Sequence, residues 1–295
     1  ALDAEPSAFA TNHLVLVVPR GRGPVDDVAD LAAPDVTWVA CVPTAPCGRV
    51  AADLRAQGSV PGEPASLLAQ TLLEPRETEG VAGFAAAGFS RLGDLAYLRR
   101  VGPAPSAASV GVLPPEVEVH SVASLLARGW APERIEAALL LALERSYIDT
   151  LDCPELCGLR SVEDVLESHR SVGRYDPAFW WLVLASGRAE GCVLMSVCPE
   201  HESVELVYLG LSPVLRGRGL GSRLLAGSLR VVLGGAAEAF GDGPGSTSLP
   251  GRCVVGTGGV TCAVDTRNEP AMRLYRAAGF QRFAVRIPMV LPLKG

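Results

Sequence analysis

A glycine-rich turn between two apolar segments most constrains how this chain can fold. The turn reads Arg216-Gly217-Arg218-Gly219-Leu220-Gly221, and it follows the strand-like run 204–211 and precedes a helix-like run that starts at Ser222. A turn that opens a helix presents several unpaired backbone N–H groups and about half a positive charge. Glycines let a bound group come close to the backbone, and arginines add charged donors. We therefore predict that this turn binds phosphate.

Length and hydrophobic content indicate a globular protein. The chain of 295 residues is long enough for two ordinary domains or one large one, and a hydrophobic fraction of 48% argues against disorder. No apolar run reaches the roughly 18 residues that span a bilayer, and the start lacks a basic segment followed by an apolar one. We expect a cytoplasmic protein without a membrane partner.

The net charge argues against one class of partner, and the cysteine content argues against a disulfide scaffold and a metal site. The net charge of −6 argues against a nucleic-acid partner, because neutralising phosphates requires a basic surface. Eight cysteines in 295 residues are too few for a disulfide scaffold. Cys153 and Cys157 have the spacing of metal ligands, but neither a second pair nor a His-x-x-His motif accompanies them. Ordinary thiols in a loop are the simpler interpretation, and we expect no metal.

An uncharged stretch rich in Pro, Gly, Ala and Ser, residues 102–115, predicts a linker. We place the domains at 1–105 and 117–295, with the linker at 106–116. In the larger domain we predict strands at 117–120, 180–185, 192–197, 204–211, 260–265 and 283–291, and helices that begin at 132, 162, 222 and 270. The three central strands form an antiparallel meander. Pro288 suggests that the last strand is an edge or is bulged, and residues 234–259 suggest a surface loop.

Two motifs in this order resemble the GNAT superfamily of acyl-CoA-dependent N-acetyltransferases. The first is Arg216-x-x-Gly219-x-Gly221, and the second is Asn268-x-x-Ala271-x-x-Leu274-Tyr275-x-x-x-Gly279-Phe280. The resemblance covers residues 117–295. It implies an α/β fold of the GNAT type with a mixed sheet of α+β character, acetyl-CoA as the acyl donor, and transfer of the acetyl group to a small-molecule or peptide amine.

The resemblance implies two catalytic residues. Tyr275 stands where the family places its general acid, and a phenol with a pKa near 10 can protonate a departing thiolate; the alternative is a core aromatic residue. Glu205 resembles the general base of the histone-acetylating branch of the superfamily. The alternatives are a charged residue on a solvated strand end, a water chain in place of the base, and another carboxylate as the base.

The resemblance also implies the residues that bind the donor and the acceptor. Main-chain amides of 217–222 would hold the pyrophosphate, and a main-chain N–H near Leu211 would meet the thioester oxygen where its strand splays from the neighbouring strand. Asn268 would bond the pantetheine arm or cap a helix. Asp152, Glu155 and Tyr208 would line the acceptor site, although loop carboxylates are often simply solvated. The implied donor-binding residues are Leu209, Leu211, Arg216, Gly217, Arg218, Gly219, Leu220, Gly221, Ser222, Asn268 and Tyr275.

An internal repeat suggests a smaller, degenerate GNAT-like module at the N-terminus. Residues 86–91 match 277–282 at five of six positions, with an offset of 191. A strand at 38–43 and a helix at 48–56 fit such a copy. It lacks the glycine turn, and Phe84 replaces Tyr275, so we expect a structural role for it. An unrelated α/β segment with a chance match is the alternative.

Two other functions are compatible with parts of the sequence. A non-catalytic module that binds acyl-CoA for regulation or scaffolding would not need Glu205 and Tyr275. A dinucleotide-binding Rossmann unit would use the same glycines, but the meander and the missing Gly-x-Gly-x-x-Gly spacing count against it. The sequence does not indicate an oligomeric state.

Overall fold

The structure is a computed structural model, and it describes residues 13–17, 37–41, 68–234, 240 and 259–292. The predicted helix 48–56 and nearly all of the predicted loop 234–259 lie outside these residues. The chain forms two compact units. Unit 2 comprises Ala96–Cys157 and Ser161–Ala284, and unit 1 comprises the described residues up to Leu95, Gly158–Arg160 and those from Val285 onward.

Unit 2 is built on a mixed sheet with the strand order β5–β10–β9–β8–β7–β6. Strands β6 (Val117–Ser121), β7 (Trp180–Ala185), β8 (Arg188–Cys198) and β9 (Ser203–Leu211) pair antiparallel in turn. The predicted meander is therefore confirmed. Strand β10 (Gly259–Asp265) then joins β9 in the parallel direction, which makes the sheet mixed, as the fold class required.

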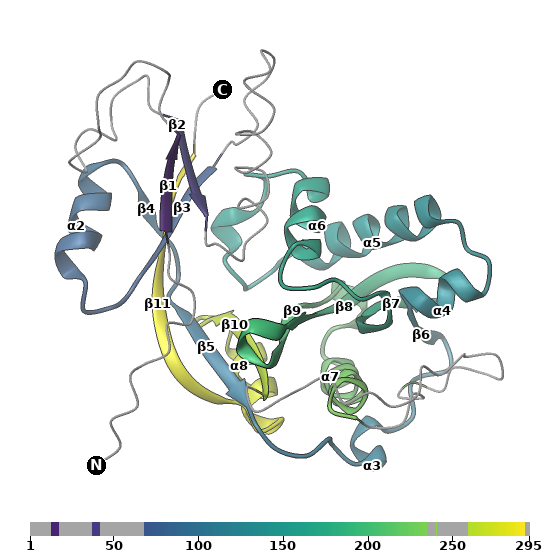
Figure 1. The fold of residues 1–295 in the computed structure, drawn as a ribbon. Coiled ribbons are helices and arrows are strands. Elements are labelled where there is room, and N and C mark those ends of the chain that lie inside the picture. Colours follow the sequence, from purple (N-terminus) through teal and green to yellow (C-terminus); the bar gives the residue numbers. More distant parts are fainter. Residues whose placement is uncertain (1–12, 18–36, 42–67, 235–239, 241–258, 293–295) are drawn as a thin grey trace. The chain divides into compact units, whose positions relative to one another are not determined.

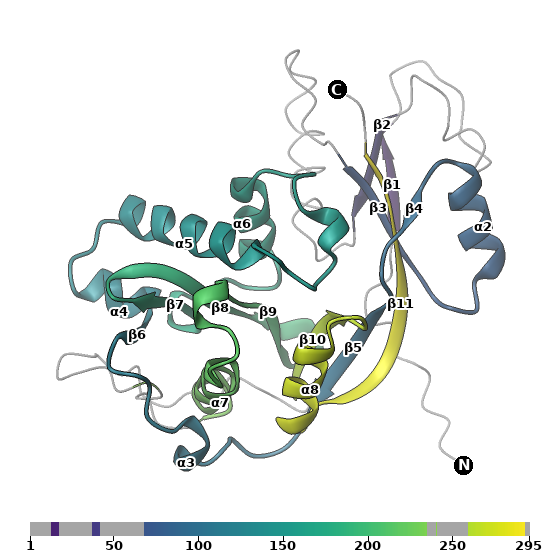
Figure 2. The same ribbon diagram turned by 180° about the vertical axis from the view of Figure 1, so that it is seen from behind.

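Helices cover both faces of this sheet (Figures 1 and 2). Alternate residues of β8 point to opposite faces, so Val193 and Met195 enter one buried cluster whereas Cys192 and Leu194 enter another. The first cluster packs against α7 (Leu220–Val232) and α8 (Glu269–Ala277). The second packs against α4 (Val122–Ala127), α5 (Pro132–Tyr147) and α6 (Val162–Arg170).

The helix ends follow local signals in the sequence. Pro132 occupies the first turn of α5. The Ser161 hydroxyl accepts a hydrogen bond from the Asp164 backbone N–H and caps α6.

In the described ranges, no helix combines the length and the apolar character needed to cross a bilayer. The cytoplasmic location stays a prediction from the sequence.

Unit 1 contains a second, smaller arrangement of strands. In it, β3 (Leu68–Leu73) and β4 (Ser90–Arg91) pair antiparallel with the later part of β11 (Gln281–Pro292). Strands β1 (His13–Val17) and β2 (Thr37–Cys41) pair with each other, which places a strand where 38–43 predicted one. The expectation of an edge strand at Pro288 was wrong, because β11 has β3 on one side and β4 on the other. Pairing with β4 involves only Met289 and Val290, so the missing N–H of Pro288 is not needed there.

The two units repeat one strand–helix–strand segment. In unit 1 it consists of β3, α2 (Thr78–Ala86) and β4, and in unit 2 of β10, α8 and the start of β11. Adding the offset of 191 to Thr78–Ala86 gives the bounds of α8. Each helix ends at a glycine with positive φ, Gly88 (91°) and Gly279 (85°), and each glycine precedes a buried phenylalanine. The repeat in sequence is therefore also a repeat in local structure.

The boundary between the units differs from the predicted domain boundary. All but the first residue of β5 (Leu95–Arg100) belong to unit 2, where Ala96 and Leu98 enter the core. The predicted linker 106–116 contains a short helix, α3 (Ala107–Val110). The later half of β11 leaves unit 2 because it pairs with β3.

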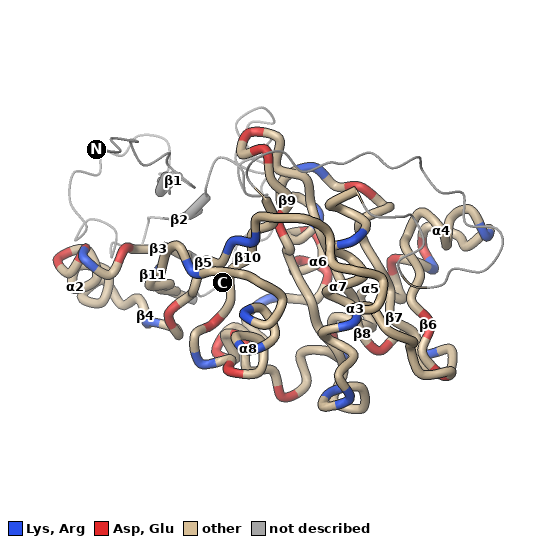
Figure 3. The backbone as a smooth tube through the Cα atoms, turned by 90° about the horizontal axis from the view of Figure 1, so that it is seen from below, with Lys and Arg blue, Asp and Glu red and all other residues tan. Residues whose placement is uncertain are grey.

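Basic and acidic residues are interspersed along the described elements (Figure 3).

Candidate active site

Strands β9 and β10 part from each other in the middle of the sheet of unit 2. Their parallel pairing covers three residues on each strand and ends at Glu205 and Thr261, although β9 continues to Leu211 and β10 to Asp265. A register shift between Leu194 and Met195 in the pairing of β8 with β9 accompanies this parting, and such bulges bend a strand. Backbone groups on this side of β9 therefore lie open beyond Glu205. The splay that the resemblance implied is present.

The glycine turn follows directly after β9 and opens α7. Gly217 and Gly219 have φ values of 73° and 72°, a conformation that side chains disfavour. Gly219 precedes α7 without a side-chain cap, and the Ser222 hydroxyl donates back to the Gly219 carbonyl at 2.7 Å. A Cβ at Gly221 would meet only Leu274, at an ordinary contact distance of 3.6 Å. The fold thus requires the first two glycines, whereas the third leaves room for a group outside the protein.

The two arginines of the turn are engaged within the protein. The Arg216 guanidinium donates to the carbonyl oxygens of Leu211 at 2.9 Å, Ser146 at 2.7 Å and Asp149 at 3.1 Å. Arg218 pairs with Glu116. Arg216 therefore braces the end of β9 against the end of α5. If the turn binds a phosphate group, its backbone amides are the free donors, because both arginine side chains already contact protein groups.

Tyr275 lies on α8 with only 7% of its surface exposed. Its ring packs against Phe280 at a centroid distance of 5.6 Å, while its hydroxyl makes no hydrogen bond with the described residues. Burial, together with the nearby thiol of Cys262 and carboxylate of Asp152, raises the pKa of Tyr275 well above 10. The side chain is thus a core aromatic that keeps a protonated, unpartnered hydroxyl.

Glu205 stands at the point where β9 and β10 part. The residue is partly exposed, yet burial of its carboxyl group among protein atoms raises its pKa to about 7. Burial raises the pKa of the Cys198 and Cys262 thiols, and the negative charge of Glu205 raises it further. Glu205 forms no ion pair with the part of the chain that the structure describes. A carboxyl group with a pKa near 7 can both accept and release a proton at neutral pH.

Residues 146–155 form a segment, here called the strap, between the end of α5 and the ends of the two parted strands. Arg216 holds its first part, as described above. Further along, the Asp152 carboxylate accepts a hydrogen bond from the Asp265 N–H at 2.8 Å, and the Cys153 N–H donates to the Asp265 carboxylate at 3.2 Å. The strap is therefore fixed to the end of β10 as well as to the end of β9.

Asp152 brings negative charge from the strap to the predicted catalytic tyrosine. Burial of its carboxyl group is the main reason why its pKa is raised. Its charge raises the pKa of the hydroxyls of Tyr147, Tyr208 and Tyr275, so all three lie within its electrostatic reach. The charge of Asp152 thus acts on Tyr275, although the two residues are 123 positions apart in the sequence.

Glu155, the other predicted acceptor-site carboxylate, is already paired. Arg267 donates to both of its carboxylate oxygens, at 2.6 and 2.9 Å, and also to the buried carboxylate of Asp265. The hydrogen bonds from Arg267 lower the pKa of Glu155. Glu155 therefore helps to hold the strap in place through Arg267. We do not include it in the proposed acceptor site.

Tyr208 lies on the α5 and α6 side of β9. Its hydroxyl bonds with the Ser146 hydroxyl at 2.8 Å, and its ring packs against Tyr147 and, at 5.3 Å, against His169. A Cβ at Gly210 would collide with the Tyr208 side chain, which explains the glycine at that position. Burial raises the pKa of Tyr208 well above 10.

The remaining predicted residues have mainly structural contacts. Asn268 caps α8, because its side-chain oxygen accepts from the Ala271 N–H at 3.2 Å. Leu209 and Leu211 pair with Val193 and Gly191 of β8. Sequence reasoning missed Asp265 and Arg267. The position of Asp265 at the end of a predicted strand was a usable signal, whereas nothing in the sequence indicated Arg267.

The Cys153 and Cys157 pair shows no metal-binding features in the described ranges. No group of three or more His, Cys, Asp or Glu side chains there could hold a metal ion. Burial raises the pKa of Cys153 to about 12 and also raises the pKa of Cys157. Both side chains are therefore thiols rather than thiolates near neutral pH.

Comparison with known proteins finds acetyltransferases. No family model matches the chain. The chain is similar to mycothiol acetyltransferase from Thermomonospora curvata, with 30% identity over 173 residues, which cover 59% of this chain and 49% of that protein. The chain therefore spans about half the length of this relative.

Solved structures of similar chains carry the same superfamily name. A GCN5-related N-acetyltransferase from Sphaerobacter thermophilus has a TM-score of 0.48 and 17% identity, and the match covers 84% of this chain and 66% of that chain. A tandem GNAT protein from the clavulanic acid biosynthesis pathway has a TM-score of 0.45 and 15% identity, with 77% and 64% coverage.

Proposed function

We propose that this chain, which resembles the GNAT superfamily, is an N-acetyltransferase that transfers the acetyl group of acetyl-CoA to a primary amine within a ternary complex. The parting of β9 and β10 just before the N-terminus of α7 is the observation that carries this proposal. It opens main-chain donors beside a turn suited to phosphate, and Glu205 and Tyr275 lie in the same region of unit 2. We also propose that unit 1 has a structural role.

The proposed donor site uses mainly backbone groups. The amides of 217–222 would hold the pyrophosphate, since the N-terminus of α7 lacks a side-chain cap. A main-chain N–H of β9 near Leu209 or Leu211 would meet the thioester oxygen and stabilise the charge that develops on it. The side-chain amide N–H of Asn268 stays available for the pantetheine arm, because only its oxygen caps α8.

Two side chains transfer protons in the proposed reaction. Glu205 accepts a proton from the protonated amine, directly or through water, and the amine nitrogen then forms a bond to the acetyl carbon. As the carbon–sulfur bond breaks, the Tyr275 hydroxyl donates its proton to the departing sulfur, and the excess proton on the new amide nitrogen returns to the Tyr275 oxygen, directly or through water. A pKa of about 7 suits Glu205 to the first transfer at neutral pH. The unpartnered hydroxyl of Tyr275 suits it to the second.

The proposed acceptor carries a positive charge before it reacts. Asp152 brings negative charge to the site, and Glu205 has no partner of opposite charge among the described residues. Both favour a protonated amine over a neutral or acidic acceptor. Tyr208, which packs beneath the strap, would contribute to the wall of the same site.

A screen of amine pools with acetyl-CoA tests the proposed activity. The quantity measured is the free thiol released from the donor. Tyr275→Phe should leave acetyl-CoA binding intact and lower turnover by roughly 10- to 1000-fold, the scale of general acid catalysis. Tyr175→Phe removes a hydroxyl from a tyrosine that packs on Trp180 instead, and it should behave as wild type.

A non-catalytic acyl-CoA-binding module is the second candidate. It would bind acetyl-CoA as tightly as an enzyme does and would release no thiol with any amine pool. The two glycines with positive φ and the open end of α7 are equally compatible with it. The unpartnered hydroxyl of Tyr275 favours the enzyme, because a binding module gains nothing from leaving a largely buried hydroxyl without a partner.

A further inference from the structure

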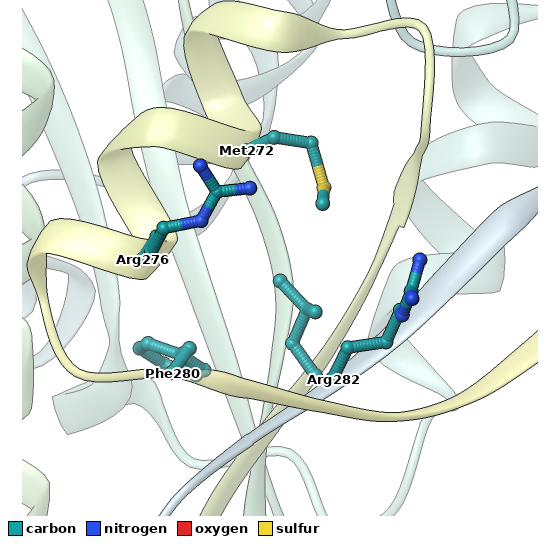
Figure 4. Close-up of a pocket in the computed structure, with 5 residues that line it drawn as sticks. Met272, Arg276, Phe280 and Arg282 are labelled. Atoms are coloured by element: carbon teal, nitrogen blue, oxygen red, sulfur yellow. The ribbon is translucent and has the colours of Figure 1, made fainter.

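A pocket on unit 2 lies outside the site described above. Five residues line it: Leu98, Met272, Arg276, Phe280 and Arg282. Figure 4 shows Arg276, from α8, and Arg282, from β11, on opposite sides of the pocket. Leu98 and Phe280, which are 3% and 4% exposed, give it an apolar floor. Its volume is about 250 Å³.

No residue that lines the pocket was assigned above to the proposed donor or acceptor site. Residues four apart share one side of a helix, so Met272 and Arg276 lie together. Leu274 and Tyr275 turn instead toward α7 and the core, where Leu274 approaches Gly221. A ligand in this pocket would therefore not occupy the proposed donor or acceptor site.

The charges in the pocket are all positive. Neither the Arg276 guanidinium nor the Arg282 guanidinium makes a hydrogen bond or an ion pair with any described residue, and no acidic residue lines the pocket. Two guanidinium groups on one small pocket repel each other unless an anion lies between them. By contrast, Arg273 on the same helix pairs with Glu269 at 3.3 Å.

The repeat within the chain gives an internal comparison. At the offset of 191, Arg282 corresponds to Arg91 of unit 1, and Arg91 pairs with Asp94 at 2.7 Å. The residue of unit 2 that corresponds to Asp94 is Val285, and the residue of unit 1 that corresponds to Arg276 is Ala85. Unit 2 thus has one more arginine and one fewer acid at this place than unit 1.

We propose that this pocket binds a small organic anion. The phosphate or carboxylate group of the ligand lies between the guanidinium groups of Arg276 and Arg282, which present forked donors suited to either anion. Its apolar body packs on Leu98, Met272 and Phe280. A volume of about 250 Å³ is below the range of drug-sized ligand pockets, so the ligand has the size of a single ring or a short chain.

Methionine-methyl NMR tests this proposal without any measurement of activity. The chain has three methionines, Met195, Met272 and Met289. Only Met272 lines the pocket, while Met195 and Met289 are buried elsewhere, at 0% and 1% exposure. Titration of the labelled full-length chain with phenyl phosphate should shift the Met272 resonance and leave the other two in place. Inorganic phosphate should bind more weakly, because it lacks the apolar body.

Variants test whether Arg276 and Arg282 bind the anion. Arg276→Gln and Arg282→Gln should each raise the Kd for phenyl phosphate roughly ten-fold, because each removes charged hydrogen bonds to the anion. The double variant should show no shift of the Met272 resonance. Arg273→Gln is the matched control and should titrate like wild type. Unchanged Met195 and Met289 resonances would show that the variants remain folded.

Three results would overturn the proposal: a Met272 resonance that phenyl phosphate does not move, equal titration by the wild type and the double variant, or equal shifts at all three methionines. None of these results bears on the proposed acetyl transfer, whose residues are different.

Discussion

At the residue scale, burial of charge decides which carboxyl groups of unit 2 suit proton transfer. Glu205 lacks a cationic partner among the described residues, and burial raises its pKa to about 7. Glu155 accepts hydrogen bonds from Arg267, and its pKa is lowered. At neutral pH Glu155 is therefore a fixed negative charge, whereas Glu205 exchanges its proton readily. The two carboxylates have different roles because their neighbours differ.

Glu205→Gln tests this difference through stability. A carboxyl group whose pKa is raised by folding favours the folded state fully only below its unfolded pKa near 4.5, and this contribution is lost as the pH rises to about 7. The Tm of Glu205→Gln should therefore rise relative to wild type between these pH values and then remain higher by a constant amount. Because Glu205 is partly exposed, we expect a gain of about 1–2 kcal/mol at pH 8.

Glu200→Gln, a change at an exposed glutamate in the turn before β9, is the control for this experiment and should follow wild type at every pH. A Tm difference for Glu205→Gln that does not change between pH 4.5 and 8 would show that the pKa of Glu205 is not raised. The same variant should also lower turnover most near neutral pH, where the amine most needs a base.

At the element scale, the strap is held by two arginines from different parts of unit 2. Arg216 ties it to the end of β9, and Arg267 ties Glu155 to the end of β10. The strap carries Asp152, so the position of that carboxylate depends on both arginines. The same guanidinium of Arg216 lies next to the turn of the proposed donor site, which makes Arg216 a connection between the two proposed sites.

Arg267→Gln should loosen the strap at the β10 end alone. We expect the KM for the amine to rise about ten-fold, within the loss that a misplacement of about 1 Å can cause, while the Kd for acetyl-CoA stays within two-fold. Arg273→Gln, whose side chain pairs with Glu269 on the same helix, should change neither value. An unchanged KM for the amine, or an equal loss of donor affinity, would remove the strap from the acceptor site.

Local elements were predictable and their long-range ties were not. The meander, α5, α6 and α8 follow from apolar periodicity and from caps such as Ser161, which act within a few residues. Arg216 reaches carbonyl groups 67 and 70 residues away, and Arg218 reaches a carboxylate 102 residues away. No spacing rule in one sequence reveals such partners. The motif predicts a phosphate-binding turn, but it does not reveal that Arg216 and Arg218 contact distant parts of the fold.

At the scale of the whole molecule, each unit contains a strand that follows the repeat of the other unit in sequence. Strand β5 follows the N-terminal repeat in sequence, yet it lies beside β10 in the sheet of unit 2. The later part of β11 follows the C-terminal repeat and pairs with β3 of unit 1. The compact units are therefore not continuous in sequence, and the composition of the stretch 102–115 could not reveal this, because composition marks a linker but not the partner of a strand.

Two truncations test the exchange. Deletion of residues 1–105 removes β5 and uncovers the core around Ala96 and Leu98, which are 0% and 3% exposed, so we expect aggregation on purification. Deletion of residues 1–94 retains β5 and should give a more soluble protein with a higher Tm. Equal solubility and equal Tm for the two truncations would show that β5 does not belong to the core of unit 2.

The central claim is that unit 2 binds one acetyl-CoA through the backbone of the turn at 217–222. Calorimetric titration of the full chain tests it most directly, with Gly221→Asp and Gly221→Ala as paired variants. The site at Gly221 accommodates a Cβ in ordinary contact with Leu274, so Gly221→Ala should fold normally and lose affinity only modestly. Gly221→Asp should lose at least 100-fold, because its carboxylate would face the pyrophosphate.

Wild type should bind one equivalent of acetyl-CoA, and Gly221→Asp should show no measurable binding while the Tm of the free protein stays unchanged. Two bound equivalents would mean that the N-terminal repeat also binds the donor. Undiminished binding by Gly221→Asp, or no binding by wild type, would contradict the assignment of the donor site.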